Sequence, residues 1–256
     1  MRIVIKIGTS TLTHTSGRLN IRRTEELCKV IADLKNAGYE VIMVSSGAIG
    51  MGVGKLSLPG KPDDMPTKQA LAAVGQCELM YTYDQLFSRY NHAVGQILIT
   101  AADINDADRY RNFSVTLERL LELGVIPIIN ENDTIATEEI VIGDNDTLGA
   151  RVAIAAKADL LVLLSDIEGL YTADPHKDPT AQLVCEVRNV DDVEALAGGA
   201  GTARGTGGMI TKLAAARMCM EAGCDMVIAD GGKPALLYDV LDGAAVGTRF
   251  LAKKGE

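Results

Sequence analysis

The chain has 256 residues, of which 47% are hydrophobic and 23% are charged, values that are typical of a globular protein and that exclude disordered and fibrous classes. Its 34 acidic residues outnumber the 25 basic ones and give a net charge of −9, which argues against nucleic acid or an anionic membrane as a partner. No stretch is long and apolar enough for a membrane span or signal peptide, and the five cysteines form no C-x-x-C pair, so we expect free thiols and a cytoplasmic location.

Apolar runs rich in Val, Ile and Leu recur along the chain and predict central parallel strands, because they are apolar on both faces. The predicted strands are residues 3–7, 41–44, 94–99, 125–129, 160–164, 226–228 and 248–251. The predicted helices are residues 21–36, 66–90, 112–123, 145–157, 190–197 and 208–222. This alternation predicts an α/β fold: a doubly wound, mostly parallel open sheet with helices on both faces, in other words an α/β/α sandwich.

We expect a single domain over residues 1–256, with approximate lobes at 1–157 and 158–256. Residues 52–66 are rich in Gly and Pro and are predicted to form a surface loop that would permit a lid motion. Residues 166–182 and 197–208 are predicted to be irregular, and the second of these segments is the most glycine-dense part of the chain.

Polar residues follow several predicted strands, at the edge of a parallel sheet where ligands bind. Lys6 interrupts an apolar strand and precedes Gly8 and Thr9, whose backbone amides suit a phosphate; the alternative is an edge-strand lysine that reaches solvent. The second strand leads into Ser45-Ser-Gly-Ala48 at the start of a helix, which is either an anion site or a simple serine N-cap.

Two acidic, amide-rich clusters lie about ten residues apart, Asn130-Glu-Asn-Asp133 and Gly143-Asp-Asn-Asp146. Such clusters hold an ammonium group, a lysine or a divalent metal, or else they are solvated turns. Further along, Ser165 and Asp166 follow the strand at 160–164, and the glycine-rich stretch Gly205-Thr-Gly-Gly-Met-Ile-Thr-Lys212 opens a predicted helix. Its backbone can approach nucleotide phosphates without a side-chain clash.

Other common sites are not indicated. Gly54-Lys55 is not followed by Ser or Thr, so there is no Walker A motif, and no G-x-G-x-x-G or G-x-S-x-G motif is present. The three histidines are too scattered for a zinc site. Two lysines, glycine-rich anion loops and a carboxylate-rich pocket suit phosphoryl transfer, and a carboxylate acceptor needs no general base because it is ionised at neutral pH.

With these motifs in order, the chain resembles the amino acid kinase family, and within it the members that phosphorylate glutamate. The motifs are VIKIGTS at 4–10, VSSGAI at 44–49, INEND at 129–133, VIGDND at 141–146, GLYTADP at 169–175 and GTGGMITK at 205–212. The resemblance implies the amino acid kinase fold and ATP-dependent phosphorylation of the γ-carboxylate of L-glutamate to L-glutamyl 5-phosphate, the first step of proline biosynthesis. It places glutamate in the first lobe and ATP in the second.

The resemblance also implies roles for individual residues. The implied catalytic residues are Lys6, Lys212 and Asp146, with the lysines neutralising the transferred phosphoryl group and Asp146 orienting them. The implied substrate-binding residues are Ser46, Asp133, Asn145, Gly47, Ala48, Asn130, Glu131 and Asp144. The implied ATP-binding residues are Lys6, Gly8, Thr9, Ser165, Asp166, Thr206, Gly207, Gly208, Met209, Ile210, Thr211 and Lys212. Mg²⁺ is expected on the ATP phosphates rather than in a protein cage.

The resemblance further implies a homo-oligomer, a dimer or a tetramer, and feedback inhibition by proline at the glutamate site. The chain ends at Glu256 without the C-terminal PUA domain that many members carry, so we expect the kinase domain alone. Two alternatives stay open: another kinase of the family, acting on acetylglutamate, aspartate or carbamate, and a catalytically silent nucleotide-sensing module.

Overall fold

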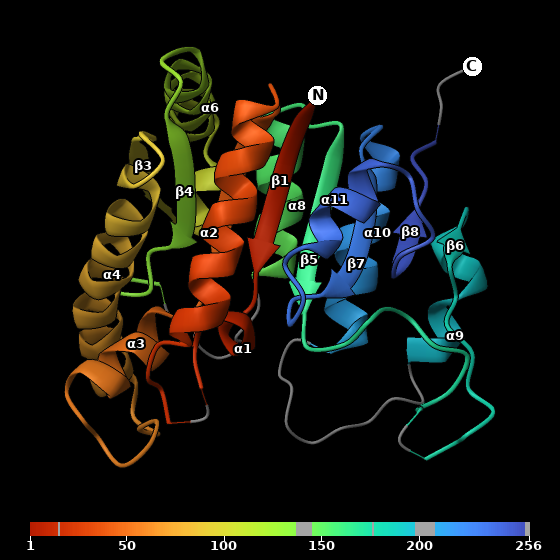
Figure 1. Ribbon diagram of the computed structural model, residues 1–256, viewed down its shortest axis with the longest axis horizontal. Coiled ribbons are helices and arrows are strands. Elements are labelled where there is room, and N and C mark those ends of the chain that lie inside the picture. Colours follow the sequence, from red (N-terminus) through yellow and green to blue (C-terminus); the bar gives the residue numbers. More distant parts are fainter. Residues whose placement is uncertain (15, 137–144, 176, 198–207, 254–256) are drawn as a thin grey trace.

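A computed structural model gives the fold and describes residues 1–14, 16–136, 145–175, 177–197 and 208–253. Within them, eight strands form one sheet in the order β3-β4-β2-β1-β5-β7-β8-β6 (Figure 1). The strands are β1 (Arg2–Ile7), β2 (Glu40–Ser45), β3 (Val94–Ile99), β4 (Ile126–Glu131), β5 (Leu160–Ser165), β6 (Glu186–Val187), β7 (Asp225–Asp230) and β8 (Thr248–Phe250).

Helices cover both faces of this sheet (Figure 1). They are α1 (Thr9–Leu12), α2 (Ile21–Asn36), α3 (Ala48–Lys55), α4 (Met65–Ser88), α5 (Ala101–Asn105), α6 (Ala107–Glu122), α8 (Asp146–Ala155), the 3₁₀ helix η1 (Val190–Asp192), α9 (Glu194–Ala197), α10 (Met209–Glu221) and α11 (Leu236–Leu241). Apolar side chains of α2, α4 and α11 pack on one face, and those of α6, α8 and α10 pack on the other. None of the described helices is long and apolar enough to cross a membrane.

The sheet is mostly parallel. Parallel pairing joins β1 to β2 and β5, β4 to β2 and β3, and β5 to β7. At the far end, β8 runs antiparallel to β7 and β6 runs parallel to β8. The predicted doubly wound α/β fold with helices on both faces is therefore confirmed. Strand β5, which follows the predicted lobe boundary at 157 and 158, pairs directly with β1, so strands from both sides of that boundary lie in one sheet.

Several predicted elements differ in detail from the structure. The strand at 94–99 is predicted to be central, but β3 lies at the edge of the sheet and most of its residues are partly exposed. The sequence does not predict β6, because two residues are too few to show a period. The predicted helix at 190–197 is divided into η1 and α9. Residues 52–55 belong to α3 and Pro66 lies in the first turn of α4, so the predicted loop shortens to 56–64.

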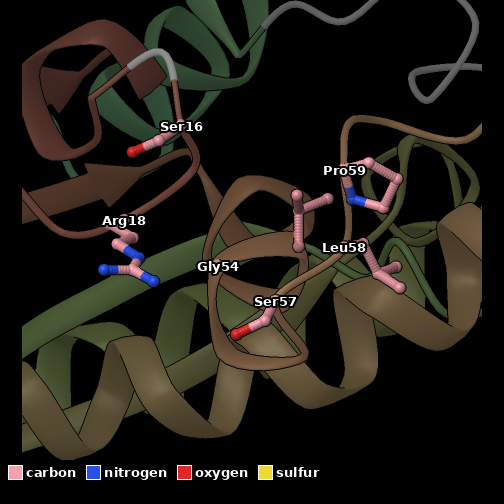
Figure 2. Close-up of a pocket in the computed structure, with 7 residues that line it drawn as sticks. Ser16, Arg18, Gly54, Ser57, Leu58 and Pro59 are labelled. Atoms are coloured by element: carbon pink, nitrogen blue, oxygen red, sulfur yellow. The ribbon is translucent and has the colours of Figure 1, made fainter.

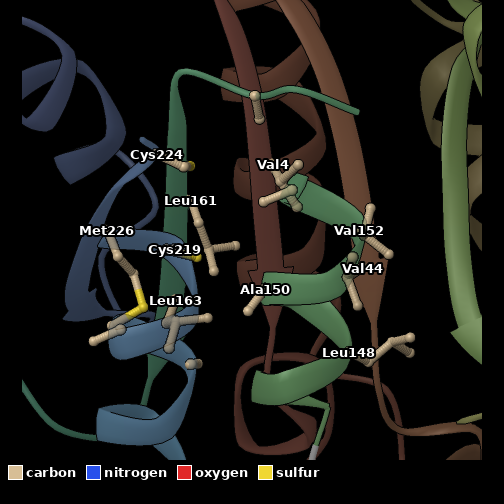
Figure 3. Packing of buried hydrophobic residues seen from close by; sticks show 14 of the residues in the cluster. Val4, Val44, Leu148, Ala150, Val152, Leu161, Leu163, Cys219, Cys224 and Met226 are labelled. Carbon is tan, nitrogen blue, oxygen red and sulfur yellow. The ribbon is translucent and has the colours of Figure 1, made fainter. Parts of the chain in front are cut away.

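Side chains along each buried strand alternate between two hydrophobic clusters. In β1, Ile3, Ile5 and Ile7 join the cluster under α2 and α4, whereas Val4 joins the cluster under α8 and α10. Figure 3 shows this second cluster, in which residues of β1, β2 and β5 pack against α8 and α10. Lys6 is two residues after Val4, so its side chain points to the same face of the sheet, toward α8 and α10, at the carboxyl end of the strand.

Two glycines allow α3 and α4 to cross with their backbones in contact. A Cβ atom at Gly75 would overlap the carbonyl oxygen of Ala48, and a Cβ atom at Gly52 would overlap the carbonyl oxygen of Leu71. In both cases the obstacle is main chain rather than a flexible side chain, so the overlap is relieved only when the helices move apart. The crossing holds the first turn of α3, which begins at Ala48, in place beneath α4.

Gly75→Ala is therefore expected to lower the free energy of unfolding by about 3 kcal/mol, the upper range for overpacking a close contact. Urea unfolding followed by circular dichroism measures the change. Gly60→Ala is the matched control, because no atom lies within 4 Å of the Cβ position at Gly60. A Gly75→Ala protein as stable as Gly60→Ala would contradict this account of the crossing.

Candidate active site

Three charged side chains from three different elements meet near the carboxyl end of β1. Lys6 Nζ lies 2.6 Å from Asp146 Oδ1, and Lys212 Nζ lies 2.9 Å from Asp146 Oδ2. The exposed fractions are 8% for Lys6, 1% for Asp146 and 8% for Lys212. Each carboxylate oxygen thus faces its own ammonium group, and the three side chains, which we call the charged triad, together carry one positive charge.

The positions of the three side chains follow from the elements that carry them. Lys6 is the fifth residue of β1, Asp146 is the first residue of α8, and Lys212 lies in the first turn of α10. Gly149 of α8 lies against β1, where a Cβ atom would be in van der Waals contact with Lys6 Cβ at 3.4 Å. In the sheet, β2 lies on one side of β1 and β5 on the other. From β1 the chain continues to β2 on one side, and from β5 it continues to β7 on the other, so the strand order changes direction between β1 and β5. Ligands usually bind at such a point in open α/β sheets, and the triad lies there.

The charged triad favours the ionised carboxylate. Burial opposes ionisation of Asp146, but attraction and hydrogen bonding from Lys6 and Lys212 outweigh burial and lower the pKa of Asp146 below its ordinary value. Thr211 adds a hydroxyl 3.5 Å from Asp146 Oδ2. An aspartate held ionised between two ammonium groups fixes both cations, and the surplus positive charge attracts an anion such as a phosphoryl group.

Next to the triad, Asn145 connects three segments of the chain. Its Nδ2 lies 3.0 Å from the Ser46 hydroxyl, 3.1 Å from the Ser45 carbonyl oxygen and 2.9 Å from Asn130 Oδ1, so its two N–H groups are shared among three acceptors. Gly47 follows Ser46 with a φ of +98°, a left-handed conformation that glycine adopts without strain, and Ala48 then begins α3. The predicted substrate residues Ser46, Asn130 and Asn145 are therefore brought together.

Two acidic residues, Glu131 and Asp133, follow Asn130 in the sequence. Glu131 is buried at the end of β4, and its backbone N–H donates to Asn130 Oδ1 at 2.9 Å. Burial raises the pKa of Asp133 to about 6, although Lys61 from the loop at 56–64 opposes the shift. We call Ser46, Asn130, Glu131, Asp133 and Asn145 the acceptor pocket. A partly buried carboxylate suits an ammonium group as its partner.

The predicted nucleotide residues lie at the ends of β1 and β5 and at the start of α10. Gly8 N donates to the Leu164 carbonyl oxygen at 3.2 Å, and Thr9 begins α1. The Ser165 hydroxyl donates to Asp166 Oδ1 at 3.1 Å. Gly208 caps α10, followed by Met209, Ile210 and Thr211. Three predicted residues, Asp144, Thr206 and Gly207, lie outside the described residues.

Two residues near the site were not predicted. Gln76 of α4 accepts a hydrogen bond from Asn130 Nδ2, and Lys61 acts on the pKa of Asp133. Neither belongs to a motif: Gln76 lies in the middle of a helix and Lys61 in a Pro- and Gly-rich loop. Only the packing of α4 against β4 could have identified Gln76.

A surface pocket of about 350 Å³ lies elsewhere, between the segment before α2 and the end of α3 (Figure 2). Its lining residues are Ser16, Arg18, Val53, Gly54, Ser57, Leu58 and Pro59. None of these residues belongs to the charged triad or to the acceptor pocket.

Comparisons with known proteins identify the family and the fold. The sequence profile described as "Amino acid kinase family" matches residues 1–230. The glutamate 5-kinase of Symbiobacterium thermophilum is 53% identical over 249 residues, which cover 97% of this chain and 95% of that protein. The glutamate 5-kinase of Caldanaerobacter subterraneus subsp. tengcongensis is 52% identical over 255 residues, which cover 99% of this chain and 68% of that protein. Carbamate kinase from Giardia lamblia superposes with a TM-score of 0.71 at 16% identity, covers 98% of each chain and shares the fold.

Proposed function

The chain belongs to the amino acid kinase family, and from this membership we propose that it transfers the γ-phosphoryl group of ATP to the γ-carboxylate of L-glutamate, forming L-glutamyl 5-phosphate and ADP. This glutamate 5-kinase activity is the first step of proline biosynthesis. The observation that carries the proposal is the charged triad, with Asp146 next in sequence to Asn145, whose amide reaches the Ser46 hydroxyl 3.0 Å away. The cations for a phosphoryl group thus adjoin the polar groups for its acceptor.

In the proposed reaction an oxygen of the acceptor carboxylate attacks the γ-phosphorus of ATP, and the bond from that phosphorus to the β-phosphate oxygen breaks. The ammonium groups of Lys6 and Lys212 neutralise charge on the transferred group, and Asp146 holds them in place. No proton is transferred, because the attacking carboxylate is already ionised. Positioning and charge neutralisation therefore supply the catalysis.

The residues also fit ATP as its magnesium complex. Both oxygens of Asp146 face lysines, so this carboxylate serves the cations of the protein rather than a metal ion. Mg²⁺ bound to the phosphates neutralises further negative charge during transfer. The helix α10, which begins at Met209, directs its N-terminal amides and Lys212 to the same region, and this arrangement supports phosphate binding there.

In the acceptor pocket we propose that Asp133 binds the ammonium group of glutamate, with Ser46, Asn145, Gly47 and Ala48 around the substrate and Asn130 and Glu131 supporting it. Asp144 belongs to the same proposal. For the nucleotide we propose Gly8, Thr9, Ser165, Asp166 and the segment from Thr206 to Lys212. Residues 1–157 would then hold glutamate, and residues 158–256 would hold most of ATP, with Gly8 and Thr9 added from the first range.

Three further points belong to the proposal. Proline carries the ammonium group and α-carboxylate of an amino acid without a γ-carboxylate, so it would compete for Asp133 without being phosphorylated. A homo-oligomer, a dimer or a tetramer, is supported by Val74 and Tyr81 of α4, which are exposed apolar side chains on one helix. A cytoplasmic location is supported by the five free cysteines.

Glutamate binding should weaken in mild acid. Since the pKa of Asp133 is raised to about 6, its carboxylate gains a proton as the pH falls through that value and then no longer attracts an ammonium group. We expect the KM for glutamate to rise about tenfold between pH 7 and pH 5, because the ionised fraction falls by about that factor. Steady-state kinetics at saturating ATP measure the change.

Asp133→Asn is the control for the pH response. This variant should have a high KM for glutamate at every pH in that range and an almost unchanged KM for ATP. A glutamate KM in the variant that still follows the pH as in the wild type would assign the titration to another group.

The reaction itself is tested by ADP release from Mg-ATP with L-glutamate, in the presence of hydroxylamine to trap an acyl phosphate as hydroxamate. N-acetylglutamate, aspartate and carbamate are run in parallel. Hydroxamate from glutamate alone is the expected result. Turnover with another acceptor would indicate a different kinase of the family, and ATP binding without turnover on any acceptor would indicate a nucleotide sensor.

A further inference from the structure

The orientation of the Asn130 side chain is fixed by its neighbours. The backbone N–H of Glu131 donates to one side-chain atom of Asn130 at 2.9 Å, and because a backbone N–H can only donate, that atom is the amide oxygen. The amide nitrogen of Asn130 must then point the other way, where Gln76 Oε1 lies 2.9 Å away. Gln76 is thus the acceptor that completes the hydrogen bonding of Asn130.

The same logic extends to Asn145. Its amide nitrogen faces the carbonyl oxygen of Ser45, which can only accept, and also faces Asn130 Oδ1. Donation therefore runs from the Asn145 amide nitrogen to Asn130 and from Asn130 to Gln76, and the same nitrogen of Asn145 also donates to the Ser46 hydroxyl. If Asn130 rotated its amide by 180°, its nitrogen would face two donors, and Asn145 would lose an acceptor.

The amide nitrogen of Gln76, Nε2, is a buried polar group without a hydrogen-bond partner among the described residues. Such a state costs free energy of folding. An apolar side chain of the same length would remove that penalty but would leave the buried Asn130 amide nitrogen without its acceptor. The glutamine therefore serves Asn130 while its own nitrogen stays unpaired.

We propose that Gln76 is a positioning residue of the acceptor pocket, which anchors the Asn130 side chain by accepting from its amide nitrogen and through Asn130 positions Asn145 and Ser46 for the acceptor carboxylate. The inference rests on the proposed function for the identity of the acceptor. Gln76 acts through Asn130, 54 residues away in sequence, from a helix that otherwise packs on the sheet. It need not touch the reacting atoms.

Gln76→Met tests the proposal, because methionine keeps the length of the side chain and removes both polar atoms. We expect the KM for glutamate to rise about tenfold, the most that one neutral hydrogen bond usually contributes, with an unchanged KM for ATP. The melting temperature without substrate should change little, because the unpaired Nε2 donor of Gln76 is removed while Asn130 Nδ2 loses its acceptor. A merely structural role predicts a lower melting temperature together with changes in both KM values.

A double-mutant cycle shows whether Gln76 acts through Asn130. In the Asn130→Ala background, Gln76→Met should have almost no further effect on the KM for glutamate. Gln85→Met is the matched control, because Gln85 is an exposed glutamine near the end of the same helix. Independent effects of Gln76→Met and Asn130→Ala, or a wild-type KM in Gln76→Met, would overturn the proposal.

A measurement without turnover separates this inference from the proposed function. In ¹⁵N NMR spectra, the side-chain amide protons of Asn130 should exchange slowly in the wild type and faster in Gln76→Met. If the wild type forms no hydroxamate from glutamate, the proposed function fails while the NMR comparison still decides the role of Gln76. Equal exchange in the two proteins would reject the positioning role whatever the substrate.

Discussion

Lys212→Met is expected to lower kcat by about a thousandfold, the range found when one group that stabilises transition-state charge is removed from a water-poor site. Methionine keeps the length and the apolar contacts of the lysine side chain but removes the ammonium group that lies 2.9 Å from Asp146. Lys6 then faces the transferred phosphoryl group alone. Because Lys212 lies outside the acceptor pocket, the KM for glutamate should change little, and kcat measured at saturating ATP and glutamate gives the effect.

Lys55→Met is the matched control for Lys212→Met. Lys55 also pairs with a carboxylate, Glu78 at 2.7 Å, but its side chain is 55% exposed. Its removal should leave kcat within about twofold of the wild type, since an exposed ion pair contributes little. A silent nucleotide-binding module would show no turnover in either protein. Equal kcat values for Lys212→Met and the wild type would contradict a catalytic role of the charged triad.

Asp146→Asn is expected to lower both stability and activity. The substitution leaves Lys6 and Lys212 buried and close together with no counter-charge, and breaking a buried ion pair on one side typically costs about 3 to 5 kcal/mol of the free energy of unfolding. Urea unfolding at neutral pH measures the loss. Glu78→Gln, which breaks the exposed pair with Lys55, is the control and should cost less than about 1 kcal/mol.

The effect of Asp146→Asn should depend on pH in a defined direction. The pKa of Asp146 is lowered in the folded protein, so its ionisation stabilises the fold above the ordinary pKa of a carboxyl group, and that contribution is lost as the pH falls through the folded pKa. The stability difference between wild type and Asp146→Asn should stay constant from pH 7 to about pH 4 and narrow below it. A difference that widens in acid would show that the carboxylate is not held ionised by the lysines.

A loss of stability must be separated from a loss of chemistry. Binding of ATP to Asp146→Asn, measured by calorimetry at a temperature where the variant stays folded, provides that separation. We expect ATP to bind while kcat falls steeply, because both lysines remain but are no longer held in place. Wild-type kcat in a folded Asp146→Asn protein would contradict the role of Asp146 in orienting the lysines.

Local patterns in the sequence determined most strands and helices. The run at 94–99 matches β3 residue for residue, and the helix predicted at 21–36 has the same bounds as α2, where the Asn20 side chain accepts from Arg23 N and Gly38 follows the helix with a φ of +94°. These features depend on neighbours a few residues apart, so the sequence reveals them. The same reasoning places the polar residues after β1, β2, β4 and β5 at one edge, since parallel strands end together.

The tertiary structure alone decided which of these elements meet. Four features have no local signal in the sequence. They are the edge position of β3, the pairing of β1 with β5, the crossing of α3 and α4 at Gly52 and Gly75, and the contact of Gln76 with Asn130. The charged triad joins residues up to 206 positions apart, counted from Lys6 to Lys212. Such contacts depend on the packing free energy of the whole sheet and its helices. The hydrophobic period of a single strand or helix shows which face is buried but does not identify the element against which that face packs.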